Sequence, residues 1–446
     1  MINFVLLSSE KYIKMEIKEL YEIYKAHPVV TTDSRNCPEG SIFFALKGET
    51  FDGNKFAVAA IEKGCAYAVV DDKEIVHPQT ILVDNVLDTL QALARYHRKQ
   101  LDIPFVGITG TNGKTTTKEL VATVLSKKYR VHYTQGNFNN HIGVPLTLLS
   151  IKPDCEMAVI EMGANHPGEI KTLANIALPT CGLITNVGKA HLEGFGSLEG
   201  VINTKKELYD NLAERGGHVF VNAANPFLMN VLNAESYTTY SSNVEVSADI
   251  NGRLLRCAPY VEFEWNNKHI ATHFVGAYNL DNMLAAITIG LHFGVAEADI
   301  CDAISNYVPA NNRSQLTKTE RNTLIVDAYN ANPTSMMAAI DNFELMEWEN
   351  KVAILGDMLE LGEQSALEHQ AIVRRLVDSK IERIVLIGDE FEKAYKQCMV
   401  NDSRFETLKK SEVNESFHAR LAALQSQLIL LKGSNGIGLY KLIPYL

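Results

Sequence analysis

Several large classes of protein are excluded by what this 446-residue sequence lacks. It has no apolar run near the ~20 residues that a membrane-spanning helix needs, so we expect no transmembrane segment. An apolar run at 2–7 is too short for a signal-peptide core, and no basic segment precedes it. Internal repeats and low-complexity tracts are also missing, which excludes solenoids and biased disordered chains. The native chain starts at either Met1 or Met15, and the sequence does not decide between them.

Excess positive charge and paired cysteines are missing as well. The chain has 42 Lys and Arg against 53 Asp and Glu, a net charge of −11. This balance argues against a general nucleic-acid or anionic-membrane binder, because phosphate-rich partners need basic surfaces. The 7 cysteines are odd in number and never in C-x-x-C spacing, so neither a zinc cluster nor a disulfide scaffold is expected. We predict reduced, mostly buried thiols in a cytoplasmic monomer.

What the sequence does contain is a regular alternation of strand-like and helix-like segments. At ~150 residues per domain the length corresponds to about three domains. We predict a small α/β domain at 1–86, a central domain at 87–311 and a Rossmann-like α/β domain at 312–446. The central domain should hold a mostly parallel sheet with helices on both faces.

The predicted strands fall into two patterns. Continuous apolar runs, typical of strands covered on both faces, occur at 41–48, 65–72, 80–85, 104–109, 156–163, 181–187, 218–223, 322–329, 351–357, 383–389 and 427–434. Alternation of apolar and polar residues predicts antiparallel strands at 244–250, 260–265 and 269–274. Helical spacing predicts helices at 57–64, 87–101, 114–129, 276–294, 334–346, 364–379 and 414–426.

One glycine-rich loop carries an explicit chemical signal. The residues GITGTNGKTT (107–116) follow a predicted strand and open a predicted helix, which is the setting of a phosphate-binding P-loop. Glycines let backbone N–H groups approach phosphates, and the helix N-terminus adds a positive dipole end. Lys114 can reach the β- and γ-phosphates, and the hydroxyl of Thr115 or Thr116 can bind Mg²⁺. The plainer alternative is a glycine turn with a solvent-facing lysine.

Ile108 stands where the general P-loop pattern has its first glycine. With this departure the loop resembles that of the Mur ligase family, and the likeness runs from residue 31 to the end. Further stretches in the family's order lie at 31–53, 136–149, 160–170, 185–208, 327–333, 355–362 and 430–434. The resemblance implies an ATP-dependent ligase that phosphorylates a carboxylate and passes the acyl group to an amine. It implies UDP-N-acetylmuramoyl-tripeptide as the acid and D-alanyl-D-alanine as the amine.

The resemblance also implies two Mg²⁺ ions and a carbamate near the γ-phosphate. Glu161 ends a predicted strand, and His191 lies just past another strand. Lys205 is implied to carry a carbamate formed from CO₂, which requires a pKa lowered by burial or by metal charge. The residues alone leave open a solvated carboxylate, a structural histidine and a Lys205-Lys206 pair on a solvated helix face, although Glu207 selects Lys205. The implied metal ligands are Thr115, Glu161, His191 and Lys205.

The nucleotide site is implied to extend into the last domain. Asn282 is implied to bind adenine, Asp327 the ribose and Arg313 the γ-phosphate when the domains close, while Asn279 could be a plain helix N-cap. Asn311-Asn312 replace the family's usual proline and glycine before the arginine, and we expect this departure to change the hinge backbone. The implied catalytic residues are Lys114, Lys205, His191 and Arg313. The implied ATP-binding residues are Gly110, Thr111, Asn112, Gly113, Lys114, Thr115, Thr116, Asn282, Arg313, Asp327 and Tyr329.

Two further groups complete the implied site. The block TTDSR (31–35) resembles a uridine-nucleotide site, with Asp52-Gly53 shaping the pocket, and the alternative is a simple turn. The residues implied to bind the UDP substrate are Ser34, Arg35, Lys47 and Gly48. The residues implied to line the rest of the substrate cleft are Asn137, Asn186, Asn330, Asn332 and Lys432.

Four other functions compete with this interpretation. The nearest is the sister ligase that adds the third amino acid to UDP-MurNAc-dipeptide, but AHLEGFGS (190–197) differs from its pattern and no DNPR motif occurs. Folylpolyglutamate synthase shares the fold but lacks the stretches around 137–145 and 163–170. A P-loop switch or regulatory ATPase would need no uridine-type domain. A dinucleotide-binding module is excluded, because the glycines at 433–438 have the wrong spacing.

Overall fold

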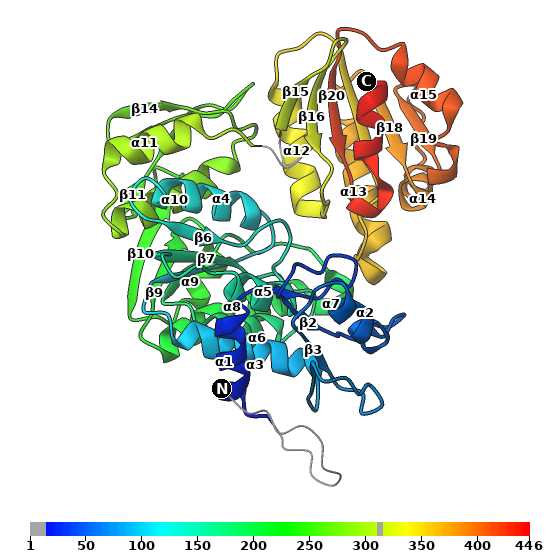
Figure 1. Ribbon diagram of the computed structural model, residues 1–446. Coiled ribbons are helices and arrows are strands. Elements are labelled where there is room, and N and C mark those ends of the chain that lie inside the picture. The colour runs from blue at the N-terminus through cyan, green and yellow to red at the C-terminus, as the bar shows by residue number, and fades with distance from the viewer. Residues whose placement is uncertain (1–14, 310–314) are drawn as a thin grey trace. The chain divides into compact units, whose positions relative to one another are not determined.

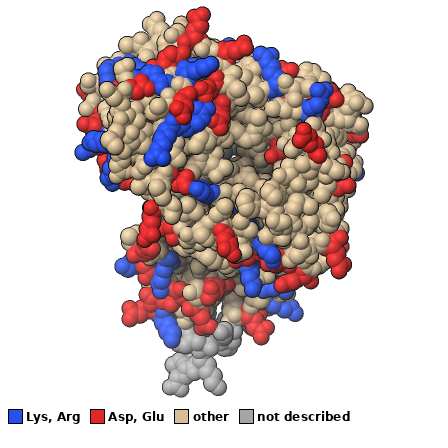
Figure 2. Space-filling model, turned by 180° about the vertical axis from the view of Figure 1, so that it is seen from behind, with Lys and Arg blue, Asp and Glu red and all other residues tan. Residues whose placement is uncertain are grey.

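The computed structural model describes residues 15–309 and 315–446. The choice between Met1 and Met15 depends on residues before this range, and Arg313 also lies outside the described residues. Across the described ranges, none of the helices has the length and apolar character needed to cross a membrane. On the face that Figure 2 shows, acidic and basic side chains interleave.

The chain forms two compact units. The first unit runs up to Gly107 and also includes residues 129–163 and 169–181. The second unit consists of residues 108–128, 164–168 and 182–446. The first unit begins with a four-stranded parallel sheet whose strands follow the chain order. These strands are β1 (Val30–Thr31), β2 (Ile42–Phe44), β3 (Tyr67–Val70) and β4 (Thr80–Leu82). The 3-10 helix η1 (Gly53–Phe56) and α2 (Ala57–Glu62) follow β2, and Phe43, Ala60 and Ala68 share their core.

A group of helices completes the first unit. These are α1 (Ile17–Ala26), α3 (Val86–Lys99), α5 (Gly143–Leu149) and α6 (Glu169–Ala177). The predicted helix at 87–101 is confirmed as α3, which packs on the other three and lies beside α1 in Figure 1. Its N-cap Asn85 accepts the N–H of Asp88 at 2.9 Å. Arg98 is buried and donates to the carbonyls of Ala177 and Leu178 at 2.9 and 3.0 Å, which fixes the end of α6.

The central region forms a sheet with the strand order β11-β10-β9-β8-β5-β7-β6, in which β5, β7 and β8 are buried along their whole length. The strands are β5 (Phe105–Thr109), β6 (Val131–Tyr133), β7 (Met157–Glu161), β8 (Cys181–Ile184), β9 (His218–Asn222), β10 (Ser236–Ser241) and β11 (Ile250–Asn251). In the first unit β6 and β7 pair in parallel, and in the second β9, β10 and β11 do so. The predicted strands at 104–109, 156–163, 181–187 and 218–223 are therefore confirmed. β10 was not predicted.

The helices of the second unit that precede residue 310 are α4 (Lys114–Leu125), α7 (Leu192–Phe195), α8 (Leu198–Glu214), α9 (Pro226–Val231), α10 (Asn279–His292) and α11 (Glu297–Asn306). Of these, α8, α9 and α10 pack on β9. The predicted helices at 114–129 and 276–294 are confirmed as α4 and α10, which pack on each other. α10 is buried on most of its circumference, which accounts for its nearly continuous apolar sequence.

The prediction for 244–250 is wrong. Only Ile250 is in a strand there, because the backbone turns at Asn243, whose carbonyl accepts the N–H of Val246 and whose side chain accepts that of Glu245. The edge strand of the three-stranded antiparallel sheet is instead β12 (Arg253–Arg256), which is exposed on both faces and so shows no alternation. β13 (Glu262–Trp265) and β14 (Lys268–Ala271) confirm the other two predicted strands.

The C-terminal region is a six-stranded sheet with the order β15-β16-β20-β17-β18-β19, drawn in yellow to red in Figure 1. Its strands are β15 (Gln315–Lys318), β16 (Thr323–Asp327), β17 (Lys351–Gly356), β18 (Arg383–Ile387), β19 (Phe405–Leu408) and β20 (Leu428–Lys432). All neighbours pair in parallel except β15, which is antiparallel to β16. Each of the four apolar runs predicted here is confirmed as a strand.

Successive residues of these strands enter two separate cores. Ile354 belongs to one core with Phe417 of α15, and Leu355 belongs to the other with Phe343 of α12. Both faces are thus apolar, which is why the strands read as continuous runs rather than alternating ones. The helices are α12 (Pro333–Leu345), α13 (Ser365–Val377), α14 (Asp389–Gln397) and α15 (Glu415–Ala422), with 3-10 turns η2 (Gly362–Gln364), η3 (Lys410–Glu412), η4 (Asn435–Ile437) and η5 (Leu439–Tyr445). α14, which buries only Phe391 and Ala394, was not predicted.

The cysteines are free thiols, as predicted, in the described parts of the chain. The expectation that most of them are buried is wrong. Only Cys65 and Cys181 are buried, and the other five are partly exposed. Those five lie in loops or on the outer sides of helices and at strand margins, where spacing alone gave no sign of exposure.

Acid is expected to destabilise the first unit through His97. This side chain of α3 is buried, and burial lowers its pKa to about 4, against 6.5 for an ordinary histidine. Between these values the unfolded chain binds more protons, so the stability that is present above pH ~6.5 falls by roughly 1–3 kcal/mol as the pH drops to ~4. Urea unfolding at several pH values measures this slope. His97→Gln should make stability less dependent on pH. An unchanged slope in the variant would show that a group other than His97 causes the pH dependence.

Candidate active site

The P-loop between β5 and α4 has a backbone that only glycine fits at two positions. Gly110 has φ +145° and Gly113 has φ +78°. A Cβ on Gly110 would lie 2.0 Å from Oγ1 of Thr185, and one on Gly113 would lie 2.6 Å from Oδ1 of Asn282. The glycines therefore serve both the left-handed turn and the close packing of the loop on its neighbours. This is the geometry expected of a phosphate cradle at a helix N-terminus.

The loop is held from the segment that follows β8. Oδ1 of Asn186 accepts the N–H of Asn112 at 2.9 Å, and Nδ2 of Asn186 donates to the carbonyl of Asn112 at 3.0 Å. The N–H of Thr111 donates to the carbonyl of Asn186 at 2.9 Å, and Oγ1 of Thr185 donates to the carbonyl of Asn112 at 2.6 Å. Asn186 was predicted to line the cleft. Its side chain instead holds the phosphate loop by bonding to the backbone of Asn112.

The cation of the loop lies over the loop itself. Nζ of Lys114 donates to the carbonyls of Gly110 and Thr111 at 2.8 and 3.0 Å. Thr115, the predicted Mg²⁺ ligand, is buried in the first turn of α4, and Thr116 is partly exposed. The ammonium group of Lys114 and the first N–H groups of α4 therefore lie together at the P-loop. Both would attract an anionic ligand.

Asn282 of α10 contacts this loop and the helix that follows it. Its Oδ1 accepts from Oγ1 of Thr117 at 3.1 Å, and its Nδ2 donates to Oδ1 of Asn279 at 2.9 Å. The side chain is buried, so in this structure it links α10 to the P-loop helix. The alternative that Asn279 caps α10 is wrong, because Asn279 is already inside the helix and its Nδ2 donates to the carbonyl of Val275 at 2.9 Å.

Glu161 ends β7 and is 1% exposed. Its Oε1 accepts from Nδ2 of Asn139 at 2.8 Å, and its N–H donates to Oγ1 of Thr134 at 3.0 Å. The alternative of a solvated strand-end carboxylate is therefore wrong. The predicted cleft residue Asn137 is exposed, and its carbonyl accepts the N–H of Asn139 at 2.7 Å. Asn139 is the partner that the sequence reasoning missed, although it lies in the same GN-x-NN segment.

The structure also separates the two adjacent lysines of α8. Lys205 is 2% exposed, and its Nζ lies 5.3 Å from the ring centre of Phe195. Lys206 points away, is 31% exposed in its side chain and forms an ion pair with Asp210 one turn later. Glu207, the residue that selected Lys205 in the sequence, accepts the N–H of Gly168 at 2.8 Å. The alternative of a lysine pair on a solvated face is wrong for Lys205.

His191 contacts the same aromatic ring. Its ring centre is 6.3 Å from that of Phe195, in an edge-on arrangement. Its backbone is left-handed, with φ +50°, at the N-cap of α7. Nδ1 of His191 forms a close pair with Oε2 of Glu360, and this pairing lowers the pKa of the Glu360 carboxyl. Glu360 was not predicted, although it lies in the LGDMLELG stretch at 355–362.

Residues of the last domain meet the P-loop through Asn332. This residue caps α12 by accepting the N–H of Ser335 at 2.9 Å, and its Nδ2 donates to Oδ1 of Asn112 at 2.7 Å. Lys432 is 1% exposed, and its Nζ lies 2.5 Å from Oδ2 of Asp327. Asp327 was predicted to bind the ribose and Lys432 to bind phosphate. In the structure the two side chains are neighbours whose opposite charges neutralise each other. Tyr329 and Asn330, in the next turn, are exposed.

Three sequence signatures together cover most of the chain. One described as "Mur ligase family, catalytic domain" matches residues 28–107, "Mur ligase middle domain" matches 108–290, and "Mur ligase, glutamate ligase domain" matches 312–435. The chain belongs to the Mur ligase family. The resemblance predicted from the P-loop form and the stretches around it is confirmed.

Relatives within the Mur ligase family match nearly end to end. The UDP-N-acetylmuramoyl-tripeptide–D-alanyl-D-alanine ligase of Bacillus subtilis (strain 168) is 34% identical over 451 aligned positions, covering 97% of this chain and 98% of that protein. MurF from Acinetobacter baumannii has a TM-score of 0.84 at 28% identity, over 95% of this chain and 97% of that one. MurF ligase from Thermotoga maritima, solved in complex with ADP, has a TM-score of 0.82 at 26% identity, over 94% and 96%. These structures confirm the predicted three-domain α/β architecture.

The segment that resembles the uridine-nucleotide site of Mur ligases carries two ion pairs of its own. Both guanidinium nitrogens Nε and Nη2 of Arg35 lie 2.9 Å from the carboxylate of Asp33, and this pairing lowers the pKa of Asp33 to about 2. Nζ of Lys47 lies 2.8 Å from Oδ1 of Asp71. The carbonyl of Ser34 accepts from Lys63 at 2.8 Å. The side chain of Arg35 is 88% exposed.

Proposed function

We propose that the chain joins D-alanyl-D-alanine to UDP-N-acetylmuramoyl-tripeptide and converts ATP to ADP and phosphate. The support comes from relatives that carry this name along nearly the whole chain, and from the likeness to a structure solved with ADP. A carboxylate acylates amines poorly, so the γ-phosphoryl group first passes to the carboxylate oxygen. The amine of the dipeptide then attacks the acyl carbon, phosphate leaves, and the amine loses a proton.

The observation that carries this proposal is that the chain holds both a P-loop and a buried lysine on α8. Lys114 supplies a cation and the first turn of α4 supplies N–H groups, which together stabilise charge that gathers on the transferring phosphoryl group. A binding switch needs only that loop. Lys205 and His191, gathered on the ring of Phe195, add a second cluster whose chemistry a switch would not require.

The residues present suit Mg²⁺ as the metal. Glu161 offers a buried carboxylate, Thr115 a hydroxyl and His191 an imidazole, and Mg²⁺ takes few protein ligands together with substrate phosphates and water. When bound, two Mg²⁺ ions would neutralise negative charge between ATP and the acid.

Lys205 is proposed to carry a carbamate. A neutral amine attacks CO₂ and loses one proton, which turns a buried cation into a buried anion that can bind a metal. Lys205 is 2% exposed, so a carbamate formed there would be shielded from bulk water. Lys206, paired with Asp210, has no such setting.

The remaining predicted contacts are retained as proposals. Asn282 and Tyr329 would contact the adenosine, Asp327 the ribose and Arg313 the γ-phosphate. Arg35 would contact the diphosphate of the UDP substrate. We propose domain boundaries after 86 and after 311, and a monomer that works in the cytoplasm on small-molecule substrates.

Phosphate release with each substrate omitted in turn tests the ligase assignment. Release should require ATP, the UDP-linked tripeptide and D-alanyl-D-alanine together, because the acyl phosphate is consumed only by the amine. Replacing the acid by UDP-MurNAc-dipeptide and the dipeptide by a single amino acid tests the sister ligase. Release that ignores the dipeptide would instead indicate a hydrolase or a switch.

A further inference from the structure

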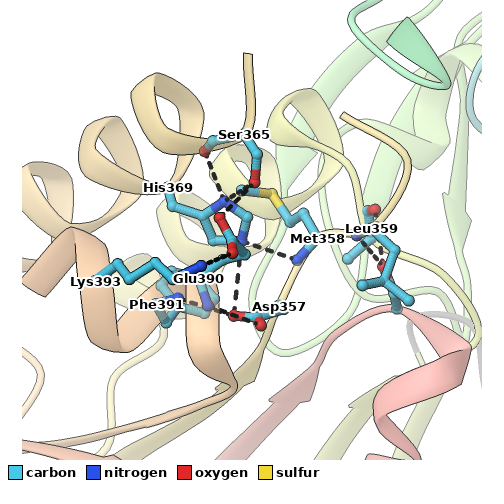
Figure 3. Close-up of polar contacts among 10 residues, drawn as sticks. Asp357, Met358, Leu359, Ser365, His369, Glu390, Phe391 and Lys393 are labelled. Carbon is cyan, nitrogen blue, oxygen red and sulfur yellow. Dashed lines mark hydrogen bonds and ion pairs between the residues drawn. The ribbon is translucent and has the colours of Figure 1, made fainter. Parts of the chain in front are cut away.

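The loop that follows β17 is anchored at three consecutive residues (Figure 3). The carboxylate of Asp357 accepts the N–H groups of Glu390 and Phe391 at 3.1 and 2.9 Å, which caps α14 from outside the helix. The N–H of Met358 donates to Nε2 of His369 at 3.1 Å. The N–H of Leu359 donates to Oγ of Ser434 at 2.9 Å. This anchoring fixes the position of the next residue, Glu360.

The imidazole in this anchor has a defined protonation pattern. Nε2 of His369 receives an N–H, so it carries a lone pair, while Nδ1 lies 2.8 Å from the carbonyl of Ser365 and must donate. The ring is fully buried, and burial lowers the pKa of His369. The anchor therefore holds the start of the loop without depending on a charged histidine.

Glu360 is presented to α7 in a strained conformation. Its φ is +64°, a left-handed value that costs a non-glycine residue about 1 kcal/mol. This conformation brings its carbonyl within 3.4 Å of the N–H of Glu193 and its carboxylate onto Nδ1 of His191. His191 is itself left-handed, with φ +50°. Two strained residues thus meet side chain to side chain, and strain of this kind concentrates at functional positions.

We propose that Glu360 is a positioning residue for His191, which it holds with the hydrogen on Nδ1 and the lone pair on Nε2. Oε2 of Glu360 lies against Nδ1 of His191, and an ionised carboxylate, which can only accept a hydrogen bond, favours the ring form that carries its hydrogen on that nitrogen. Histidines that bind metals commonly donate their second nitrogen to a carboxylate in this way. Nε2 is then the atom available to the second Mg²⁺. This inference rests on the proposed function, because it assumes that His191 binds that metal.

The tautomer of His191 is a direct readout that needs no activity. In protein labelled with ¹⁵N-histidine, His191 is assigned by the signal that disappears in His191→Gln. The wild-type ring should show a protonated Nδ1 and an unprotonated Nε2. In Glu360→Ala the ring should shift towards the Nε2–H form or a mixture, and Glu360→Gln, which keeps a carbonyl acceptor, should retain much of the Nδ1–H form. An Nε2–H ring in the wild type would overturn the proposal.

Metal affinity is the second readout, with Mn²⁺ as the probe in the presence of a non-hydrolysable ATP analogue. Electron paramagnetic resonance of free Mn²⁺ should show about 10- to 100-fold weaker binding for Glu360→Ala. The double variant with His191→Ala should bind no more weakly than His191→Ala alone, because Glu360 acts through that ring. The side chain of Glu360 is 54% exposed, so circular dichroism should report an unchanged fold.

A matched control distinguishes the positioning of the His191 ring from a general loss of contact between the segments that carry His191 and Glu360. Nζ of Lys189 lies 2.6 Å from Oε1 of Glu368, an ion pair beside the His191 contact that does not touch the ring. Glu368→Gln should leave both the tautomer and the Mn²⁺ affinity within about twofold of wild type. Equal losses in Glu368→Gln and Glu360→Ala would overturn the proposal, as would Mn²⁺ affinity that only His191→Ala reduces. Substrate-omission assays on the wild type test the ligase function separately.

Discussion

Lys205→Ala is expected to lose ligase activity almost completely, by at least about 10³-fold in kcat. The variant loses the proposed buried anion, which water cannot replace, and removal of a single group that stabilises transition-state charge costs about 10²–10³-fold in other enzymes. Phosphate release with all three substrates measures the loss. Lys205 buries its amine against Phe195, and no other lysine of α8 does so among the described residues.

Two controls make the Lys205 result specific. Short carboxylic acids added to Lys205→Ala should restore part of the activity, because a small carboxylate can occupy the space that the carbamate leaves. Lys206→Ala, which removes the adjacent and partly exposed lysine, should retain near wild-type rates, since it breaks only the pair with Asp210. Full activity in Lys205→Ala would remove this residue from the mechanism.

Lys114→Met should reduce kcat by about 10²–10³-fold, because it removes the one cation that lies over the P-loop backbone in the described structure. A fluorescent ATP analogue should also bind more weakly, since methionine keeps the apolar stem and loses the charge. Phosphate release and nucleotide binding measured together distinguish the two effects.

The matched control for Lys114 lies just beyond the other end of the same helix. Lys127, whose Nζ lies 2.6 Å from Oδ2 of Asp302, is distant in sequence from the loop. Lys127→Met should keep both ATP binding and turnover. A Lys114→Met protein that turns over ATP at the wild-type rate would contradict the assignment of the phosphate loop.

Much of the fold follows from local sequence. β17 and β20 were predicted because strands covered on both faces are apolar at every position, so a continuous run is enough to find them. The predictions failed where that rule gives no signal. β12 is exposed on both sides, α14 buries only two side chains, and 244–249 is broken by the turn at Asn243.

The active site divides in the same way. The sequence by itself determined the phosphate loop, since glycines at 110 and 113, Lys114 and the following helix are consecutive and their roles depend on local backbone geometry. It also determined the family, through long stretches in a fixed order. These features need no knowledge of which segments meet in space.

Only the tertiary structure decided between neighbouring candidates. It brought Asn139, which was not predicted, to Glu161, placed Lys205 rather than Lys206 in the interior, and brought Glu360 to His191 across 169 positions of sequence. The physical reason is that burial and hydrogen bonding depend on which side of a helix or loop faces another segment. That choice is made by packing between residues far apart in the chain, and adjacent residues of the same type look alike until the packing is known.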